Sequence, residues 1–171
     1  MCLGCIGERV AKSWAELTAG TGTDPRDELV WFDTEIMTPM PVACLNITYT
    51  AVCAHHLLPF FGKVDLAYMA PPYWVAGASK MSRVVNSLAR RITLQEEISA
   101  GIVQAFATVL EPFGGVPIVV HVAGTHLCMM ARGVKQPDAT LITENCWDSD
   151  PKLSNVNQLW ATLARAQARG F

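Results

Sequence analysis

The sequence predicts an α+β domain in which helices cover one face of an antiparallel sheet. Apolar residues recur every three or four positions in the N-terminal, middle and C-terminal parts of the chain, which is the spacing of amphipathic helices. The segments between them are rich in valine, threonine and other residues that favour strands. In chain order the segments are helix, two strands, two helices, two strands and helix, which is the order of an α+β fold.

In the N-terminal part we expect one helix followed by a pair of strands. The helix covers residues 8–17, where the apolar side chains fall on one helical face. The strands cover residues 40–52 and 62–69, and Pro59 and Gly62 mark the turn between them. A hairpin is therefore the first expected part of the sheet.

The middle of the chain predicts two helices after a short linker over residues 73–78. Met81 and the apolar residues three, four and seven positions later share one face of the first helix, and Ser79 is placed to cap its start. A second helix follows over residues 94–109. Its end is marked by the helix-breaking residues Pro112, Gly114 and Gly115.

The C-terminal part is expected to complete the sheet and to add a last helix. Residues 116–131 form an apolar, β-branched run that predicts a strand, paired with a segment near residues 140–143. Amphipathic spacing predicts a helix over residues 155–168. Because the 171 residues contain no internal repeat and no low-complexity segment, we expect a single domain over residues 1–171.

Composition restricts the classes of function. The net charge of −2 provides no overall positive field to hold a nucleic-acid backbone or an anionic membrane surface. No apolar run approaches the roughly 18 to 20 residues of a membrane span, and the N-terminus lacks the features of an export signal, so we expect a cytoplasmic protein. With 51% hydrophobic and only 16% charged residues, the chain is apolar for a soluble monomer, which favours a homo-oligomer.

Two short clusters gather two cysteines and three of the four histidines of the chain. The first contains Cys53, His55 and His56, and the second contains His126 and Cys128. Thiolate and imidazole are ligands that Zn²⁺ prefers, and a catalytic zinc site uses three protein ligands with a fourth position for water. If the second cluster lies on a strand, alternation directs residues 126 and 128 to one site. A structural zinc site is the main alternative, but the additional histidines favour proton transfer.

The helix that starts near residue 79 combines an exposed N-terminus with hydroxyl and cationic side chains, an arrangement that favours a phosphate. Further cations lie on the first helix and just beyond the second Cys/His cluster. For each of these groups alone, a solvated surface is the simpler explanation. The candidate anion-binding residues are Arg9, Lys12, Ser79, Lys80, Arg83 and Arg132.

Gln95 and Glu96 stand near the start of the helix over residues 94–109. Acidic groups at a helix start often do no more than complement the helix dipole. A carboxylate in that position can also accept two N–H donors from a guanine base. These residues alone leave both interpretations open.

In combination, these stretches resemble GTP cyclohydrolase I over residues 8–134. The matching stretches are Arg9-Val10-Ala11-Lys12, Cys53-Ala54-His55-His56 with Pro59-Phe60 and Gly62-Lys63, Gly77-Ala78-Ser79-Lys80 with Arg83, Gln95-Glu96, and His126-Leu127-Cys128-Met129 with Arg132-Gly133-Val134. The resemblance implies the tunnelling fold, in which α+β subunits join edge to edge into a barrel-like ring and two rings stack, commonly as a decamer. We expect only the last helix of that family's longer N-terminal extension.

The resemblance implies a zinc-dependent hydrolysis of GTP. Cys53, His56 and Cys128 would bind Zn²⁺, which lowers the pKa of the attacking water, and His55 and His126 would transfer protons. Water would attack C8 of the purine, and C8 would leave as formate. Rearrangement with the ribose carbons would give 7,8-dihydroneopterin triphosphate, a compound that serves pterin and folate synthesis or 7-deazaguanine synthesis.

The resemblance also implies how GTP is bound. Glu96 would bind the guanine edge, with Gln95 nearby. Some of the residues that receive the triphosphate would come from a neighbouring subunit. These triphosphate-binding residues would be Arg9, Lys12, Ser79, Lys80, Arg83 and Arg132.

The chain departs from the family pattern at three alanines. Ala54 and Ala123 stand where the family has acidic residues, and Ala78 stands where it has leucine. These departures keep two alternatives open. One is the same zinc chemistry on a different purine nucleotide, and the other is a non-catalytic purine-binding ring that retains zinc for stability.

Overall fold

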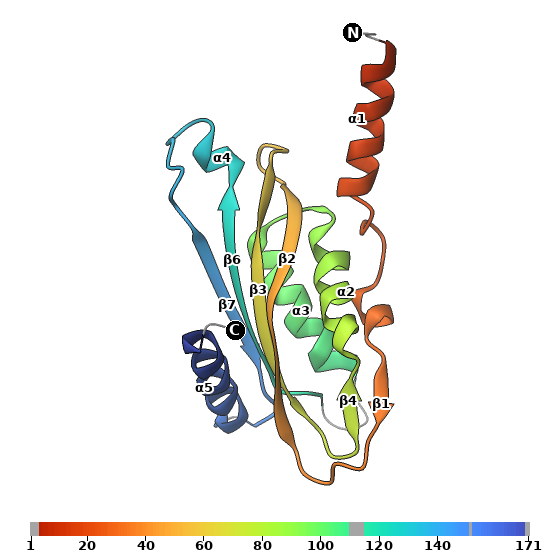
Figure 1. Ribbon diagram of the computed structural model, residues 1–171, viewed down its shortest axis with the longest axis vertical. Helices are drawn as coiled ribbons and strands as arrows, with labels where there is room; N and C mark the ends of the chain where they lie inside the picture. The colour runs from red at the N-terminus through yellow and green to blue at the C-terminus, as the bar shows by residue number, and fades with distance from the viewer. Residues whose placement is uncertain (1–3, 110–114, 151, 170–171) are drawn as a thin grey trace.

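The computed structural model describes residues 4–109, 115–150 and 152–169. Its centre is a five-stranded sheet in the order β5-β2-β3-β6-β7 (Figure 1). In that order the strands are β5 (Ile92–Thr93), β2 (Met40–Cys53), β3 (Pro59–Ala70), β6 (Ile118–His126) and β7 (Leu141–Trp147). Neighbours from β2 to β7 are antiparallel, whereas β5 is parallel to β2. The α+β class and both predicted strand pairs are confirmed.

Helices α2 (Ala78–Ala89) and α3 (Gln95–Val109) pack on one face of the sheet (Figure 1). Alternate strand residues point to the same face, so Leu66, Tyr68 and Val120 belong to this core. The helices contribute the apolar positions that their periodicity predicts. The buried helical residues include Met81, Val84, Val85 and Leu88 on α2 and Ile98, Ile102, Ala105 and Phe106 on α3.

The last helix, α5 (Ser154–Ala168), packs on the opposite face of the sheet (Figure 1). Its Leu159 and Leu163 form a second buried cluster with Ala67 of β3 and Val119 of β6. The structure therefore differs from the expected arrangement with helices on one face only. The physical reason is that β3 and β6 each contain consecutive apolar residues, which is typical of strands covered on both faces.

The strand predicted over residues 116–131 is shorter than expected. β6 ends at His126, and a short helix, α4 (Leu127–Met130), follows directly. The apolar character of the sequence continues through α4, so composition alone did not separate the strand from the helix. Of the residues expected to end α3, Pro112 and Gly114 lie outside the described residues.

Residues 73–78 form more than a linker. Within them, β4 (Trp74–Ala76) pairs antiparallel with β1 (Trp31–Asp33) in a two-stranded sheet. Gly77 occupies the N-cap position of α2, and no side chain caps it, so the predicted capping role of Ser79 was wrong. β4 leads directly into α2, which begins above β4 in the lower half of the molecule in Figure 1.

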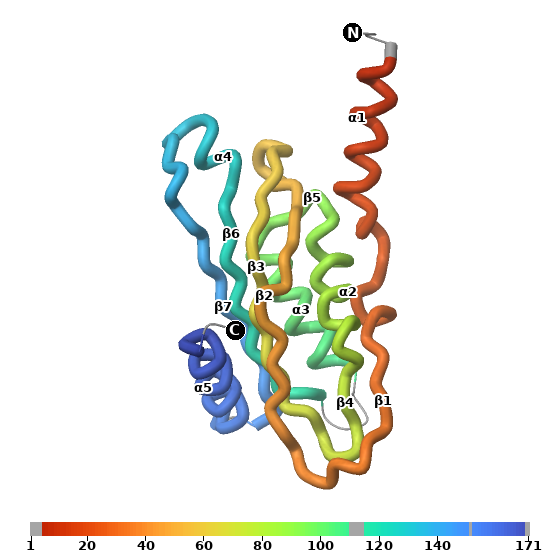
Figure 2. The backbone as a smooth tube through the Cα atoms, in the orientation of Figure 1, coloured from red at the N-terminus to blue at the C-terminus, as the bar shows by residue number. Residues whose placement is uncertain are grey.

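Helix α1 (Gly4–Leu17) extends away from the remainder of the chain (Figures 1 and 2). It contains the helix predicted over residues 8–17 and begins before it. Ile6 and Val10 are 40% and 48% exposed, so part of its apolar stripe faces solvent. Neither α1 nor any other helix in the described ranges is long and apolar enough to cross a membrane.

We expect Leu159→Ala to lower the free energy of unfolding by about 2–5 kcal/mol, because it opens a cavity where a fully buried side chain joins α5 to the sheet. Urea denaturation measures the change. The exposed neighbour provides a control, since Gln158→Ala should change stability by no more than about 0.5 kcal/mol. Equal effects of the two substitutions would contradict the docking of α5.

Candidate metal centre and surrounding site

The topology of the sheet brings the two Cys/His clusters to one end of the molecule. β2 and β6 are both antiparallel to β3, so they run in the same direction and their C-terminal ends lie together. β2 ends with Cys53 and β6 ends with His126. Helix α4 then places Cys128 near the end of β2, with its Sγ 4.0 Å from the Sγ of Cys53.

Cys53, His126 and Cys128 form a group that could hold a metal ion. Their ligand atoms all lie within 4.8 Å of one another, and Cys53 and His126 are buried. Two sulfur donors and one imidazole nitrogen fit Zn²⁺, and three protein ligands leave a position for water or substrate. The two clusters therefore meet, as predicted. The local structure differs from the prediction, because β6 ends at His126 and Cys128 lies on the helix α4 instead of on the same strand.

His126 is held in a defined position. Its ring stacks on Phe60, its partner across the β3–β6 pair, with ring centres 4.3 Å apart and planes 9° apart. Its Nε2 lies 3.1 Å from Oε1 of Gln95. Burial lowers the pKa of His126, the Glu96 carboxylate opposes this effect, and His55 adds to it. The net result favours the neutral imidazole, the form needed to accept a proton or to bind a metal.

His55 and His56 lie in the exposed turn that follows β2. Leu57 has a φ of 55° and its N–H donates to the carbonyl of Cys53, which closes the turn tightly. Nδ1 of His55 lies 3.7 Å from Sγ of Cys53, so His55 borders the metal group. His56 is not among the three residues that the structure groups. The set observed together and the set implied by the resemblance therefore share both cysteines and differ in the histidine.

The charges of two further predicted residues act on the metal group. Burial and the neighbouring Cys53 thiol raise the pKa of Cys128, while the Arg132 guanidinium opposes them. A bound cation must therefore displace a thiol proton at Cys128. On the other side, Glu96 is exposed at the start of α3 and close enough for its charge to act on His126.

The remaining anion-binding candidates lie away from this group within one chain. Ser79, Lys80 and Arg83 are on the first half of α2, which begins just above β4 in the lower half of Figure 1, whereas α4 lies near the top of the sheet. Arg83 lies 4.0 Å from Glu28, both on the surface. The last two candidates, Arg9 and Lys12, are exposed on the projecting helix α1 (Figure 2).

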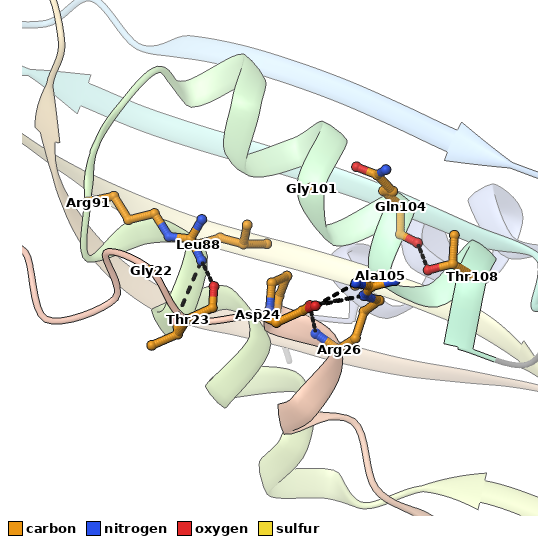
Figure 3. Close-up of a pocket in the computed structure, with 11 residues that line it drawn as sticks. Gly22, Thr23, Asp24, Arg26, Leu88, Arg91, Gly101, Gln104, Ala105 and Thr108 are labelled. Atoms are coloured by element: carbon orange, nitrogen blue, oxygen red, sulfur yellow. Dashed lines mark hydrogen bonds and ion pairs between the residues drawn. The ribbon is translucent and has the colours of Figure 1, made fainter.

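A cavity of about 440 Å³ lies between the loop after α1 and helices α2 and α3 (Figure 3). Arg91 closes one side by donating to the carbonyl of Thr23 at 2.7 Å, and the ion pair of Asp24 with Arg26 borders another. No residue that the sequence suggested for the site lines this cavity. It is therefore separate from the metal group.

Sequence reasoning missed three residues that build the site around His126. Phe60 provides the stacking surface, Tyr49 hydrogen bonds to Gln95, and Gly124 leaves the space in which they meet. Phe60 belongs to one of the stretches that resemble the family, but the sequence assigned it no function. Tyr49 carried a usable signal, because it lies four residues before Cys53 on β2 and so on the same face of that strand.

The chain is similar to known proteins over most of its length. The sequence model of the family described as GTP cyclohydrolase I matches residues 3–158, which include both Cys/His clusters and the start of α3. A GTP cyclohydrolase 1 from Halalkalibacterium halodurans is 38% identical over 136 residues, covering 80% of this chain and 70% of that protein. Those from Wolinella succinogenes and Geobacillus kaustophilus are 37% and 39% identical over the same length, with 80% of this chain and 71% and 70% of their own chains covered.

We expect Cys128→Ala to lose most of the bound zinc, because it removes one of the two sulfur donors that lie 4.0 Å apart. The experiment loads the protein with Zn²⁺, removes excess ion by dialysis and measures the metal that remains. Cys146→Ala is the matched control, since Cys146 is exposed on β7. Equal zinc in the two variants would show that the grouped residues are not the binding site.

Proposed function

The chain belongs to the GTP cyclohydrolase I family, and from that premise we propose that it converts GTP and water to 7,8-dihydroneopterin triphosphate and formate. The observation that carries this proposal is the meeting of Cys53, His126 and Cys128 at one end of the sheet, with His55 and Glu96 beside them. Two thiols and imidazoles next to a carboxylate provide a metal-assisted hydrolytic site with a group suited to a guanine base. The product would serve pterin and folate synthesis or 7-deazaguanine synthesis.

We propose that the metal is Zn²⁺, held by Cys53, Cys128 and His56. When bound, zinc would act as a Lewis acid and would lower the pKa of water. The two thiols support this ion, and such thiols persist in a reducing compartment, for which we propose the cytoplasm. We assign the third position to His56 on the resemblance to the family, and this assignment leaves His126, which Gln95 and Phe60 hold in place, for proton transfer.

His55 and His126 are the proposed proton-transfer pair. Both lie at the metal group, and burial keeps His126 neutral and able to accept a proton. Glu96 is the proposed guanine reader, because a carboxylate accepts from both N1–H and the exocyclic amine of guanine. Adenine has neither an N1–H nor an amine on C2, so it would leave this carboxylate without either donor.

We propose that a neighbouring subunit completes the triphosphate site, in a homo-oligomer built as two stacked rings, commonly a decamer in this family. The distance along α2 between its cationic start and the metal end of the sheet supports this proposal, as does the surface position of Ser79 and Arg83. The triphosphate would bind residues from more than one chain, with Arg132 supplied beside Cys128. The remaining proposed triphosphate residues are Arg9, Lys12, Ser79, Lys80 and Arg83.

The alanines that replace acidic residues of the family bear on the choice of substrate. Ala54 precedes His55 in the exposed turn, so a lost carboxylate there changes the surface beside the metal group. Ala123 lies opposite Lys63 in the β3–β6 pair, and Lys63 donates to Asn46. A different purine nucleotide is therefore the alternative to test beside GTP.

Zinc-loaded protein incubated with GTP should release formate, and the product should show pterin fluorescence after oxidation. Incubation with ATP should give neither signal. Glu96→Gln should weaken GTP binding on the order of 10- to 100-fold, because it removes a charged acceptor. Glu97→Gln is the matched control, since the Glu97 carboxylate is occupied locally by Thr93 and Leu94. Binding of GTP without formate would support a purine-binding ring, and formate from another purine nucleotide alone would change the substrate.

Substituting His56 and His126 one at a time distinguishes which of the two histidines binds the metal. His56→Ala should lose zinc, while His126→Ala should retain zinc and lose turnover on the order of 100- to 10,000-fold, the contribution typical of an acid–base group. Metal analysis and formate release measure the two properties. The reverse result, with zinc lost in His126→Ala and kept in His56→Ala, would make His126 the ligand.

A further inference from the structure

The side chain of Gln95 lies completely buried between α3 and the sheet. Its Nε2 donates to the carbonyl oxygens of Val122 at 3.1 Å and of Leu141 at 3.0 Å. Its Oε1 lies 3.3 Å from the Tyr49 hydroxyl and 3.1 Å from Nε2 of His126. All four hydrogen-bonding positions of the amide are therefore occupied by the protein itself.

These partners determine which way the amide points. A backbone carbonyl can only accept a hydrogen bond, so the end of Gln95 that faces Val122 and Leu141 must be the NH₂ group. The oxygen then faces Tyr49 and His126 and can only accept. It follows that the Tyr49 hydroxyl donates to Oε1 and that Nε2 of His126 carries a hydrogen.

We propose that Gln95 is a positioning residue that locks His126 in the tautomer with hydrogen on Nε2, and that Tyr49 supports it as the second donor to the same oxygen. Nδ1 of His126 is then the nitrogen that carries no hydrogen. This role replaces direct substrate contact, because a side chain that is fully buried with every polar atom engaged has nothing left to offer GTP. Only the turnover measurements below rest on the proposed function.

Gly124 is a condition for this arrangement. It lies on β6 between Val122 and His126, and a Cβ at this position would collide with Oε1 of Gln95 and with the Tyr49 hydroxyl. The absence of a side chain therefore creates the space in which the amide, the phenol and the imidazole meet. A methyl group at residue 124 should displace the amide oxygen from His126.

The first test uses the unsubstituted, zinc-loaded protein and does not depend on activity. Nitrogen-15 NMR of the four histidine rings distinguishes a protonated from an unprotonated ring nitrogen, and the signals that are missing from the spectrum of zinc-loaded His126→Ala are those of His126. We expect hydrogen on Nε2 and none on Nδ1. Hydrogen on Nδ1 in the parent protein would overturn the proposal whatever the protein does with GTP.

The second test substitutes the amide. Gln95→Met keeps the side-chain length and removes the acceptor, so His126 should populate both tautomers. With GTP, kcat should fall about 10- to 100-fold, as is typical for loss of a partner that orients a site histidine, while KM stays within about twofold. An increase in KM at unchanged kcat would instead assign Gln95 to substrate binding and contradict the proposal.

The third test guards against a Gln95 variant that fails to fold. Gly124→Ala should disturb the His126 tautomer, and adding Tyr49→Phe should restore it in part, because removal of the hydroxyl gives the amide oxygen room to move. Tyr68→Phe is the matched control, since the Tyr68 hydroxyl is also buried but bonds to the Ala76 amide in another part of the core. The proposed arrangement would be wrong if Gly124→Ala left the His126 tautomer unchanged. It would also be wrong if adding Tyr68→Phe to Gly124→Ala restored the tautomer as well as adding Tyr49→Phe does.

Discussion

The site depends first on the directions of three neighbouring strands. Because β3 is antiparallel to both β2 and β6, β2 and β6 end on the same side of the sheet. Cys53 at the end of β2 therefore meets His126 and Cys128 at the end of β6. The part of the ladder between these strands that lies farthest from the metal group is buried on both faces, between α2 and α3 on one side and α5 on the other. A shift of register by one residue would turn Cys53 to the opposite face, so the packing of the whole sheet maintains the metal group.

The start of α3 divides two tasks between consecutive residues. Gln95 points into the sheet, where its amide satisfies two backbone carbonyls and holds His126, while Glu96 faces solvent beside the same imidazole. A buried amide is tolerated because none of its polar atoms is left unpaired, and an unpaired one costs roughly 1–3 kcal/mol. The same contacts that stabilise the fold thus orient a group of the proposed reaction. The core packing therefore holds the His126 ring in place without additional contacts.

Much of this could be predicted from the sequence, and the failures have physical causes. Residue types and spacing identified both Cys/His clusters, and helical periodicity located α2, α3 and α5, because these signals are local. The turn from strand to helix after His126 was not predictable from hydrophobicity, since Leu127 and Met130 suit either structure. The position of α5 on the second face depends on tertiary packing against Ala67 and Val119. The choice between His56 and His126 at the metal group depends on distances that no sequence pattern contains.

The two edge strands of the sheet fit the proposed assembly of several copies into a ring. β5 and β7 are the outermost strands, and each carries an exposed apolar residue, Ile92 at 50% and Ile142 at 55% exposure. Free strand edges with apolar side chains favour pairing with another chain. Pairing of the β7 side of one copy with the β5–β2 side of the next would cover both edges at once and would generate a closed ring by repetition. The cations on α1 and α2 would then need to reach only the metal end of a neighbouring copy. The proposed ring would therefore account both for the apolar composition and for the separation, within one chain, of the residues proposed to bind the triphosphate.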